Sequence, residues 1–181
     1  MMKKALKKIT LLLFIIIMAM LIFQFIVSNQ VEDSPLPTKL HPTVAEAKDK
    51  LISQTKANGI TIIITDGFRS IAEQDALFEQ GRTTDGNIVT NVRGGDSYHN
   101  YGLAIDFALQ LEDGSVIWDL EYDGNDNGKA DWMEVVEIAK KLGFTWGGDW
   151  DNFRDYPHLQ MDFDLSIRAL KRGKRPDENT N

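Results

Sequence analysis

Two histidines and two aspartates in the C-terminal half of this chain have types and spacings that suit metal-assisted hydrolysis. His99 precedes Asp106 by seven residues, and Asp155 precedes His158 by three. Catalytic zinc is typically held by three ligands from His, Asp, Glu or Cys, with a fourth position left for water. Three of these residues suit the ligand roles, and Asp155 suits the role of general base. A zinc hydrolase is therefore the first hypothesis; the alternative is an ordinary His–Asp hydrogen bond beside an unrelated histidine.

The elements that must position these residues can be read from hydrophobic periodicity. Residues 103–109 and 158–163 alternate between apolar and other side chains, so each is predicted to be a strand with one apolar face. Asp106 and His158 lie on the opposite faces and converge if the two strands are neighbours. Helices are expected over 43–57, 71–80, 131–142 and 164–171, and a further strand over 60–65. Strands and helices do not alternate strictly, which favours an α+β fold.

The N-terminal part of the chain differs from the rest. Four lysines within residues 1–8 precede an apolar run over 9–27, which predicts a cytoplasmic basic segment and a transmembrane anchor with the remaining chain outside the cell membrane. The alternative is a cleaved signal peptide and a secreted protein. Residues 28–42 contain three prolines and are predicted to be a linker. A single domain is then expected over 43–172, followed by a polar tail over 173–181.

The charge and the cysteine content exclude several classes of function. The chain has 27 acidic and 20 basic residues, a net charge of −7, which argues against nucleic acid as a partner because its binding requires a basic face. There is no cysteine, so every thiol-based mechanism is excluded. We expect a monomer.

Together these motifs resemble a known family. The string Ser97-x-His99-x-x-Gly102-x-Ala104-x-Asp106 followed by Asp155-x-x-His158 resembles the zinc D,D-peptidases of the hedgehog/DD-peptidase fold. The segments Trp-Gly-Gly-Asp-Trp at 146–150 and Gly-Phe-Arg-Ser at 67–70 are similar to the branch of L-alanyl-D-glutamate endopeptidases that includes phage endolysins. The resemblance covers about residues 40–163.

The resemblance implies a small antiparallel sheet flanked by helices and a zinc ion held by His99, Asp106 and His158. It also implies that Asp155 is the catalytic base and that Arg69 polarises the scissile carbonyl or binds a substrate carboxylate. An arginine between a strand and a helix N-cap is chemically suited to that task, because a guanidinium stabilises developing negative charge on oxygen. The alternative for Arg69 is a surface salt bridge.

The leading hypothesis is thus a membrane-anchored zinc peptidase that cleaves the stem peptide of peptidoglycan at the L-Ala–D-Glu bond. A D-Ala-D-Ala carboxypeptidase is the second hypothesis, although members with that activity often carry Glu at the position of Asp155. A non-catalytic module that binds the cell wall on the same fold is the third. The intact set of ligands and base argues against it, because a binding module does not need the base.

A second candidate metal site lies outside the resemblance. Residues 123–134 fit the calcium-loop pattern D-x-[DN]-x-[DN]-G-x5-E. The predicted ligands are Asp123, Asn125, Asn127, Asp131 and Glu134. Two of the five are neutral, and strings of Asn, Gly and Asp also form ordinary turns. Weak calcium binding and a simple turn both remain hypotheses here.

Overall fold

The computed structural model describes residues 2–28 and 34–177 of the chain. Contacts divide it into two units, 1–33 and 34–181. The first unit contains a single helix, α1 (Met2–Ser28). Within residues 13–25 of that helix the side chains are exposed, and most of them are large and apolar.

None of the helices in the described parts of the chain is long and apolar enough to span a membrane. The predicted transmembrane helix over 9–27 is therefore not supported by the structure.

The second unit is built on a small antiparallel sheet with the order β1-β2-β5-β4, and a short strand, β3, pairs with the end of β2. The strands are β1 (Ile62–Asp66), β2 (Ala104–Gln110), β3 (Val116–Ile117), β4 (Thr145–Trp146) and β5 (His158–Gln160). Every pairing is antiparallel. The expectation of a small antiparallel sheet with helices is confirmed.

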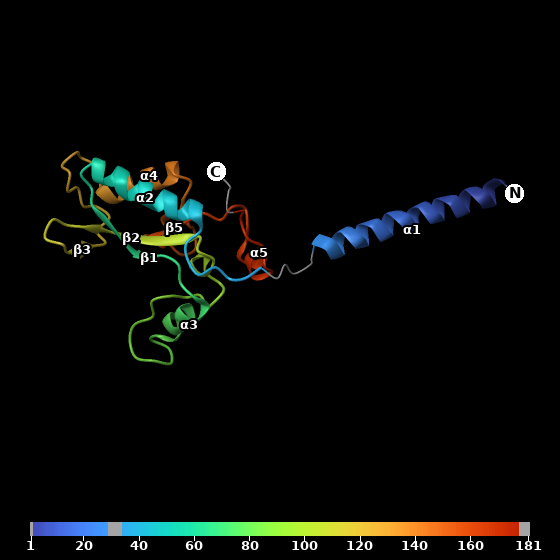
Figure 1. The fold of residues 1–181 in the computed structure, drawn as a ribbon, viewed down its shortest axis with the longest axis horizontal. Helices are drawn as coiled ribbons and strands as arrows, with labels where there is room; N and C mark the ends of the chain where they lie inside the picture. The colour runs from blue at the N-terminus through green and yellow to red at the C-terminus, as the bar shows by residue number, and fades with distance from the viewer. Residues whose placement is uncertain (1, 29–33, 178–181) are drawn as a thin grey trace. The chain divides into compact units, whose positions relative to one another are not determined.

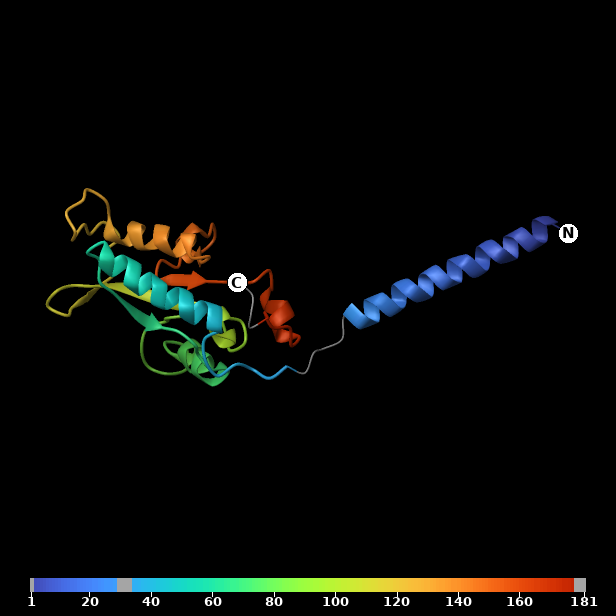
Figure 2. The same cartoon turned by 45° about the horizontal axis from the view of Figure 1, so that its top comes forward.

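Two helices cover one face of this sheet (Figures 1 and 2). They are α2 (Pro42–Ala57) and α4 (Asp131–Lys141), and they pack against each other as well as against the strands. The apolar face of β2 meets them, and Phe107 stacks on Trp132 with 4.5 Å between the ring centroids. Both of these side chains have no exposed surface. The helix periodicity in the sequence therefore marks the faces that form the core.

Helix α3 (Ile71–Glu79) lies on the other side of the sheet (Figures 1 and 2). It begins at a capping box in which Ser70 accepts a hydrogen bond from the Glu73 backbone and the Glu73 side chain accepts one from the Ser70 backbone. The last helix, α5 (Ile167–Lys171), is shorter than the predicted 164–171. Asp164 adopts a positive φ angle that is incompatible with a helix, and Ser166 is the N-cap, so the helix begins at Ile167.

The strand register brings the predicted ligands together. Asp106 of β2 lies directly opposite His158 of β5. On the other side of β2 the register shifts between Ile64 and Asp66, so that Asp66 also lies opposite Asp106. Bulges of this kind redirect side chains and are frequent beside active sites.

Several short elements have no periodicity signal in the sequence. The helical turns η1 (Tyr98–Tyr101) and η2 (Gly147–Asp149), like β3 and β4, are too short for one. Gly102 ends η1 with a φ of 68°, and a Cβ there would collide with the backbone carbonyl of Lys39. A glycine at this position therefore allows the turn that carries His99 to lie against the segment before α2.

Candidate metal centre and active-site groove

Three donor atoms from three separate elements meet at one point on the sheet. The Nε2 atom of His99 lies 3.2 Å from Nδ1 of His158 and 3.3 Å from Oδ1 of Asp106, and Nδ1 of His158 lies 3.2 Å from the same Oδ1. Both histidines are buried and Asp106 is half-buried. Metal bonds of 2.0–2.1 Å at tetrahedral angles separate ligand atoms by about 3.3 Å. The triangle thus has the size of one face of a tetrahedral metal site.

The hydrogen bonds on the far side of each imidazole are consistent with such a site. Nδ1 of His99 lies 2.7 Å from the carbonyl oxygen of Gly67, which only accepts, so that nitrogen carries the proton. Nε2 of His158 lies 3.0 Å from Oε1 of Gln160, which assigns the proton to Nε2. The nitrogens that face each other are then both lone-pair donors beside a carboxylate oxygen. Three electron-rich atoms this close repel one another unless a cation lies between them.

The electrostatics of the group follow from this arrangement. Burial alone would raise the pKa of Asp106, but when the imidazoles of His158 and His99 are protonated toward it, their hydrogen bonds and positive charge outweigh burial and hold that pKa well below its usual range. Burial opposes protonation of His158, but Asp106 raises the pKa of this imidazole. Asp106 is therefore an anionic ligand at neutral pH, and among the described residues this trio is the only group of three or more His, Cys, Asp or Glu side chains close enough to hold a metal ion.

A groove of about 510 Å³ opens over the three donors. Asp155 lines it together with His99, Asp106 and His158, so the structure places the predicted base in the same groove as the predicted ligands. Burial raises the pKa of the Asp155 carboxyl above its usual value, a shift in the direction that strengthens it as a general base. The apolar walls of the groove include Val89, Val92, Trp150 and Phe153.

Gly147 allows Asp155 to lie this close to the metal ligands. Its carbonyl accepts a hydrogen bond of 3.1 Å from the Asp155 backbone. A Cβ on Gly147 would overlap the Asp155 backbone and come within 3.2 Å of the His158 Cβ. Trp150, just after η2, lies with its ring centroid 5.2 Å from that of His158. The Trp-Gly-Gly-Asp-Trp segment therefore packs the base and the third ligand together.

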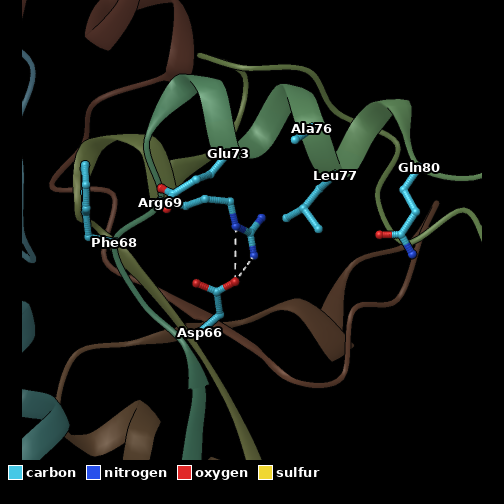
Figure 3. A pocket seen from close by; sticks show the side chains of 7 residues that line it. All are labelled: Asp66, Phe68, Arg69, Glu73, Ala76, Leu77 and Gln80. Atoms are coloured by element: carbon cyan, nitrogen blue, oxygen red, sulfur yellow. Dashed lines mark hydrogen bonds and ion pairs between the residues drawn. The ribbon is translucent and has the colours of Figure 1, made fainter. Parts of the chain in front are cut away.

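Arg69 reaches the groove from the turn between β1 and α3. Nε and Nη2 both donate to Oδ2 of Asp66, and Nη1 donates to Oε1 of Gln74 at 2.7 Å. Figure 3 shows the guanidinium facing the Asp66 carboxylate, beside a second cavity of about 390 Å³ that is lined by Phe68, Glu73, Ala76, Leu77 and Gln80 as well. Nη2 of Arg69 is 4.0 Å from Oδ2 of Asp106. Arg69 does form a salt bridge, with Asp66, but only 13% of the arginine side chain is exposed.

The calcium loop predicted over 123–134 is not supported as a metal site. Asp123, Asp131 and Glu134 are not close enough together to form a ligand group. Asn125 and Asn127 direct their amide Nδ2 atoms at Oε2 of Glu134, at 3.1 and 2.8 Å. Within the loop, neutral amide N–H groups therefore hydrogen-bond to the Glu134 carboxylate in the place that a cation would take. Oδ1 of Asp131 is buried and has no hydrogen-bond partner.

The comparisons with known proteins agree with the site. The sequence profile of the family described as D-alanyl-D-alanine carboxypeptidase (Peptidase M15) matches residues 90–161, which include His99, Asp106, Asp155 and His158. The peptidoglycan L-alanyl-D-glutamate endopeptidase CwlK of Bacillus subtilis (strain 168) is 65% identical over 133 residues, which are 74% of this chain and 80% of that protein. The chain belongs to the M15 peptidase family.

One further relative and one solved structure define the extent of the similarity. The L-alanyl-D-glutamate peptidase of Listeria phage A118 is 34% identical over 125 residues, which are 69% of this chain but only 39% of the phage protein. Among solved structures, an L,D-carboxypeptidase DacB from Streptococcus has a TM-score of 0.51 at 22% identity, with 76% of this chain and 73% of the other covered. The structural likeness supports the fold of the second unit.

The sequence analysis missed three residues that support the site of this M15 peptidase. Gln160 fixes the His158 tautomer, while Asp66 and Gln74 hold Arg69. Gln160 was recognisable as the next residue on the same strand face as His158. Asp66 had no such signal, because its direction depends on a register shift that only strand pairing produces.

Proposed function

We propose that this M15 peptidase hydrolyses the L-Ala–D-Glu bond of the peptidoglycan stem peptide and uses one zinc ion. The convergence of His99, Asp106 and His158 at the base of a groove that also contains Asp155 carries this proposal. The choice of bond is supported by the 65% identical relative, which is named for cleavage of that bond.

The residues of the chain have separate tasks in this reaction. A zinc ion bound to the three donors would supply a Lewis acid and lower the pKa of a nearby water. Asp155 accepts the proton of the attacking water and delivers it to the leaving amine, so the carboxyl returns to its starting state. Arg69 donates an N–H to the scissile carbonyl oxygen as negative charge develops there. The apolar walls of the groove exclude bulk water around these groups.

The charge of the groove favours an internal peptide bond over a C-terminal one. A carboxypeptidase must bind the terminal carboxylate of its substrate, which requires an available cation. Arg69 is the only Lys or Arg among the described residues that line the groove, and Asp66 and Gln74 already occupy three of its five N–H groups. Asp96, Asp106 and Asp155 line the same groove. The lining thus offers a substrate one partly occupied cation against three carboxylates.

Digestion of defined muropeptides by the purified, zinc-loaded chain tests the proposal. Mass spectrometry should detect a fragment that begins with D-Glu and a complementary fragment that ends in L-Ala. Loss of a terminal D-Ala instead would establish the carboxypeptidase alternative. Binding of muropeptide without any product would establish a non-catalytic module.

We further propose that the enzyme works as a monomer outside the cytoplasmic membrane. All the proposed catalytic groups come from one chain, and peptidoglycan lies outside that membrane. The lysines before residue 9 and the apolar residues after it are typical of export segments, either retained or cleaved. Cell fractionation should detect the protein in the membrane or the medium, and deletion of residues 1–28 should leave it in the cytoplasm.

A further inference from the structure

The Arg69 guanidinium is held on two edges by two different side chains. Asp66 binds Nε and Nη2, and Gln74 binds Nη1. Three of the five N–H donors of a guanidinium are therefore occupied, and its plane is fixed by partners on both sides. The remaining donors belong to the terminal nitrogens, and Nη2 is the one that lies 4.0 Å from Oδ2 of Asp106. The two partners thus decide where the free N–H groups point.

Gln74 is an unusual residue in its helix. It is the only buried residue of α3, and it has no exposed surface. Its amide is used at both ends: Oε1 accepts from Arg69 at 2.7 Å, and Nε2 donates to the Val92 carbonyl at 3.0 Å and to the Thr90 hydroxyl at 3.3 Å. A guanidinium cannot accept and a carbonyl cannot donate, so only one orientation of the amide satisfies both neighbours.

The residues on the other end of this amide form part of the groove. Thr90 and Val92 line it, as does Arg69, whereas Gln74 does not. Gln74 therefore joins the arginine to Thr90 and Val92 of the groove lining, without lining the groove itself. The backbone of the same turn is held independently, because Asn100 donates to the Arg69 carbonyl at 2.9 Å. Loss of Gln74 should thus release the guanidinium and leave the turn in place.

We propose that Gln74 is a positioning residue that aims the Arg69 guanidinium at the reacting carbonyl and couples it to the groove wall at Thr90–Val92. This inference rests on the proposed function, because it assigns a task to a residue behind the same site. Gln74 raises turnover only through Arg69. Positioning errors of about 1 Å at a reacting group cost on the order of 10²-fold in rate, and a partly released guanidinium should cost on the order of 10–100-fold.

A double-mutant cycle on the zinc-loaded full chain tests this inference. Gln74→Met keeps the length of the side chain and removes both hydrogen-bonding ends. We expect it to lower kcat on an L-Ala–D-Glu muropeptide about 10–100-fold, with a smaller change in KM and unchanged zinc content. In an Arg69→Ala background, the same Gln74→Met change should lower kcat less than about twofold, because a residue that acts through Arg69 has nothing left to position.

Two further variants separate positioning from stability. Gln74→Glu keeps the acceptor for Arg69 but loses the donors to Thr90 and Val92, so kcat should recover most of the loss even where the melting temperature falls. Gln54→Met makes the same chemical change at an exposed position on α2 and should leave kcat unchanged.

The outcomes distinguish this inference from the proposed function. An equal loss of kcat from Gln74→Met with and without Arg69 would show that Gln74 acts on the fold alone. An equal loss in Gln74→Glu and Gln74→Met would also overturn the positioning role. If the unmodified chain releases no D-Glu-initiated fragment, or Arg69→Ala is fully active, the proposed function or the role of Arg69 fails instead.

Discussion

Two regions of this molecule have spacings typical of metal sites, and the fold treats them differently. His99, Asp106 and His158 come from a turn and two strands, and their donor atoms lie 3.2–3.3 Å apart. The loop over 123–134 has a nearly complete calcium pattern within a single stretch of chain, yet its carboxylates are not gathered. The contiguous calcium-loop motif was thus a weaker predictor of a metal site than the three dispersed residues. Donors aligned by a rigid sheet cannot relax away from one another, whereas those of a loop can bond to neighbouring amides.

Removal of a metal-donor side chain should have the largest effect on zinc binding and hydrolysis. We expect this effect at the His99–Asp106–His158 site and not in the loop over 123–134. His99→Ala and His158→Ala should each lose zinc and all measurable hydrolysis, a loss far above the 10–100-fold that the removal of an outer partner costs. Asp123→Ala should retain both. Metal content by mass spectrometry and muropeptide digestion measure the two properties. Stoichiometric zinc in the His158→Ala protein would remove it from the ligand set.

The base should be separable from the ligands. Asp155→Asn should keep zinc but lower turnover about 10²–10⁴-fold, which is the usual contribution of a general base. The control is Asp151→Asn, at an exposed position in the same segment, which should be active. Loss of zinc from the Asp155 variant would instead make this residue a ligand, and normal turnover would exclude it from the chemistry.

Gln160, which hydrogen-bonds to His158 on the side away from the metal site, should have a smaller effect on zinc binding. Gln160→Leu removes the acceptor that assigns the proton to Nε2 of His158, so zinc affinity should fall about 10–100-fold. Competition with a chromogenic chelator measures this affinity. The matched variant Gln110→Leu, at the far end of β2, should bind zinc as the unmodified chain does. Equal affinities in both variants would contradict the role of Gln160.

The smallest effect is expected in the loop. Glu134→Gln weakens the bonds from Asn125 and Asn127, which should lower the stability of the fold by about 0.5–1.5 kcal/mol. Because these amides already occupy the glutamate, the loss should be the same in millimolar Ca²⁺ and in millimolar Mg²⁺. Thermal melting of the zinc-loaded chain measures it. A rise in melting temperature with Ca²⁺ alone, absent in the Glu134 variant, would restore the calcium hypothesis.

Sequence reasoning went furthest where a short pattern reports directly on geometry. The alternation over 103–109 placed Asp106 on the face opposite the core, and the strand register shows it paired with His158 as expected. The capping pattern at Ser70 located the start of α3 at Ile71. In both cases neighbouring residues determine the structure, because strand alternation and helix capping act within a few positions.

The sequence by itself determined the class of this protein: the types and spacing of His99, Asp106 and His158 indicated a metal hydrolase, and the helices and main strands followed from periodicity. Only the tertiary structure decided which spacing became a converged site. It also decided that Asp66 and Gln74 hold Arg69, since a register shift redirects Asp66 and Gln74 takes the one buried position of α3. Side-chain convergence depends on strand pairing and packing between distant segments, and periodicity along the chain carries no information about either.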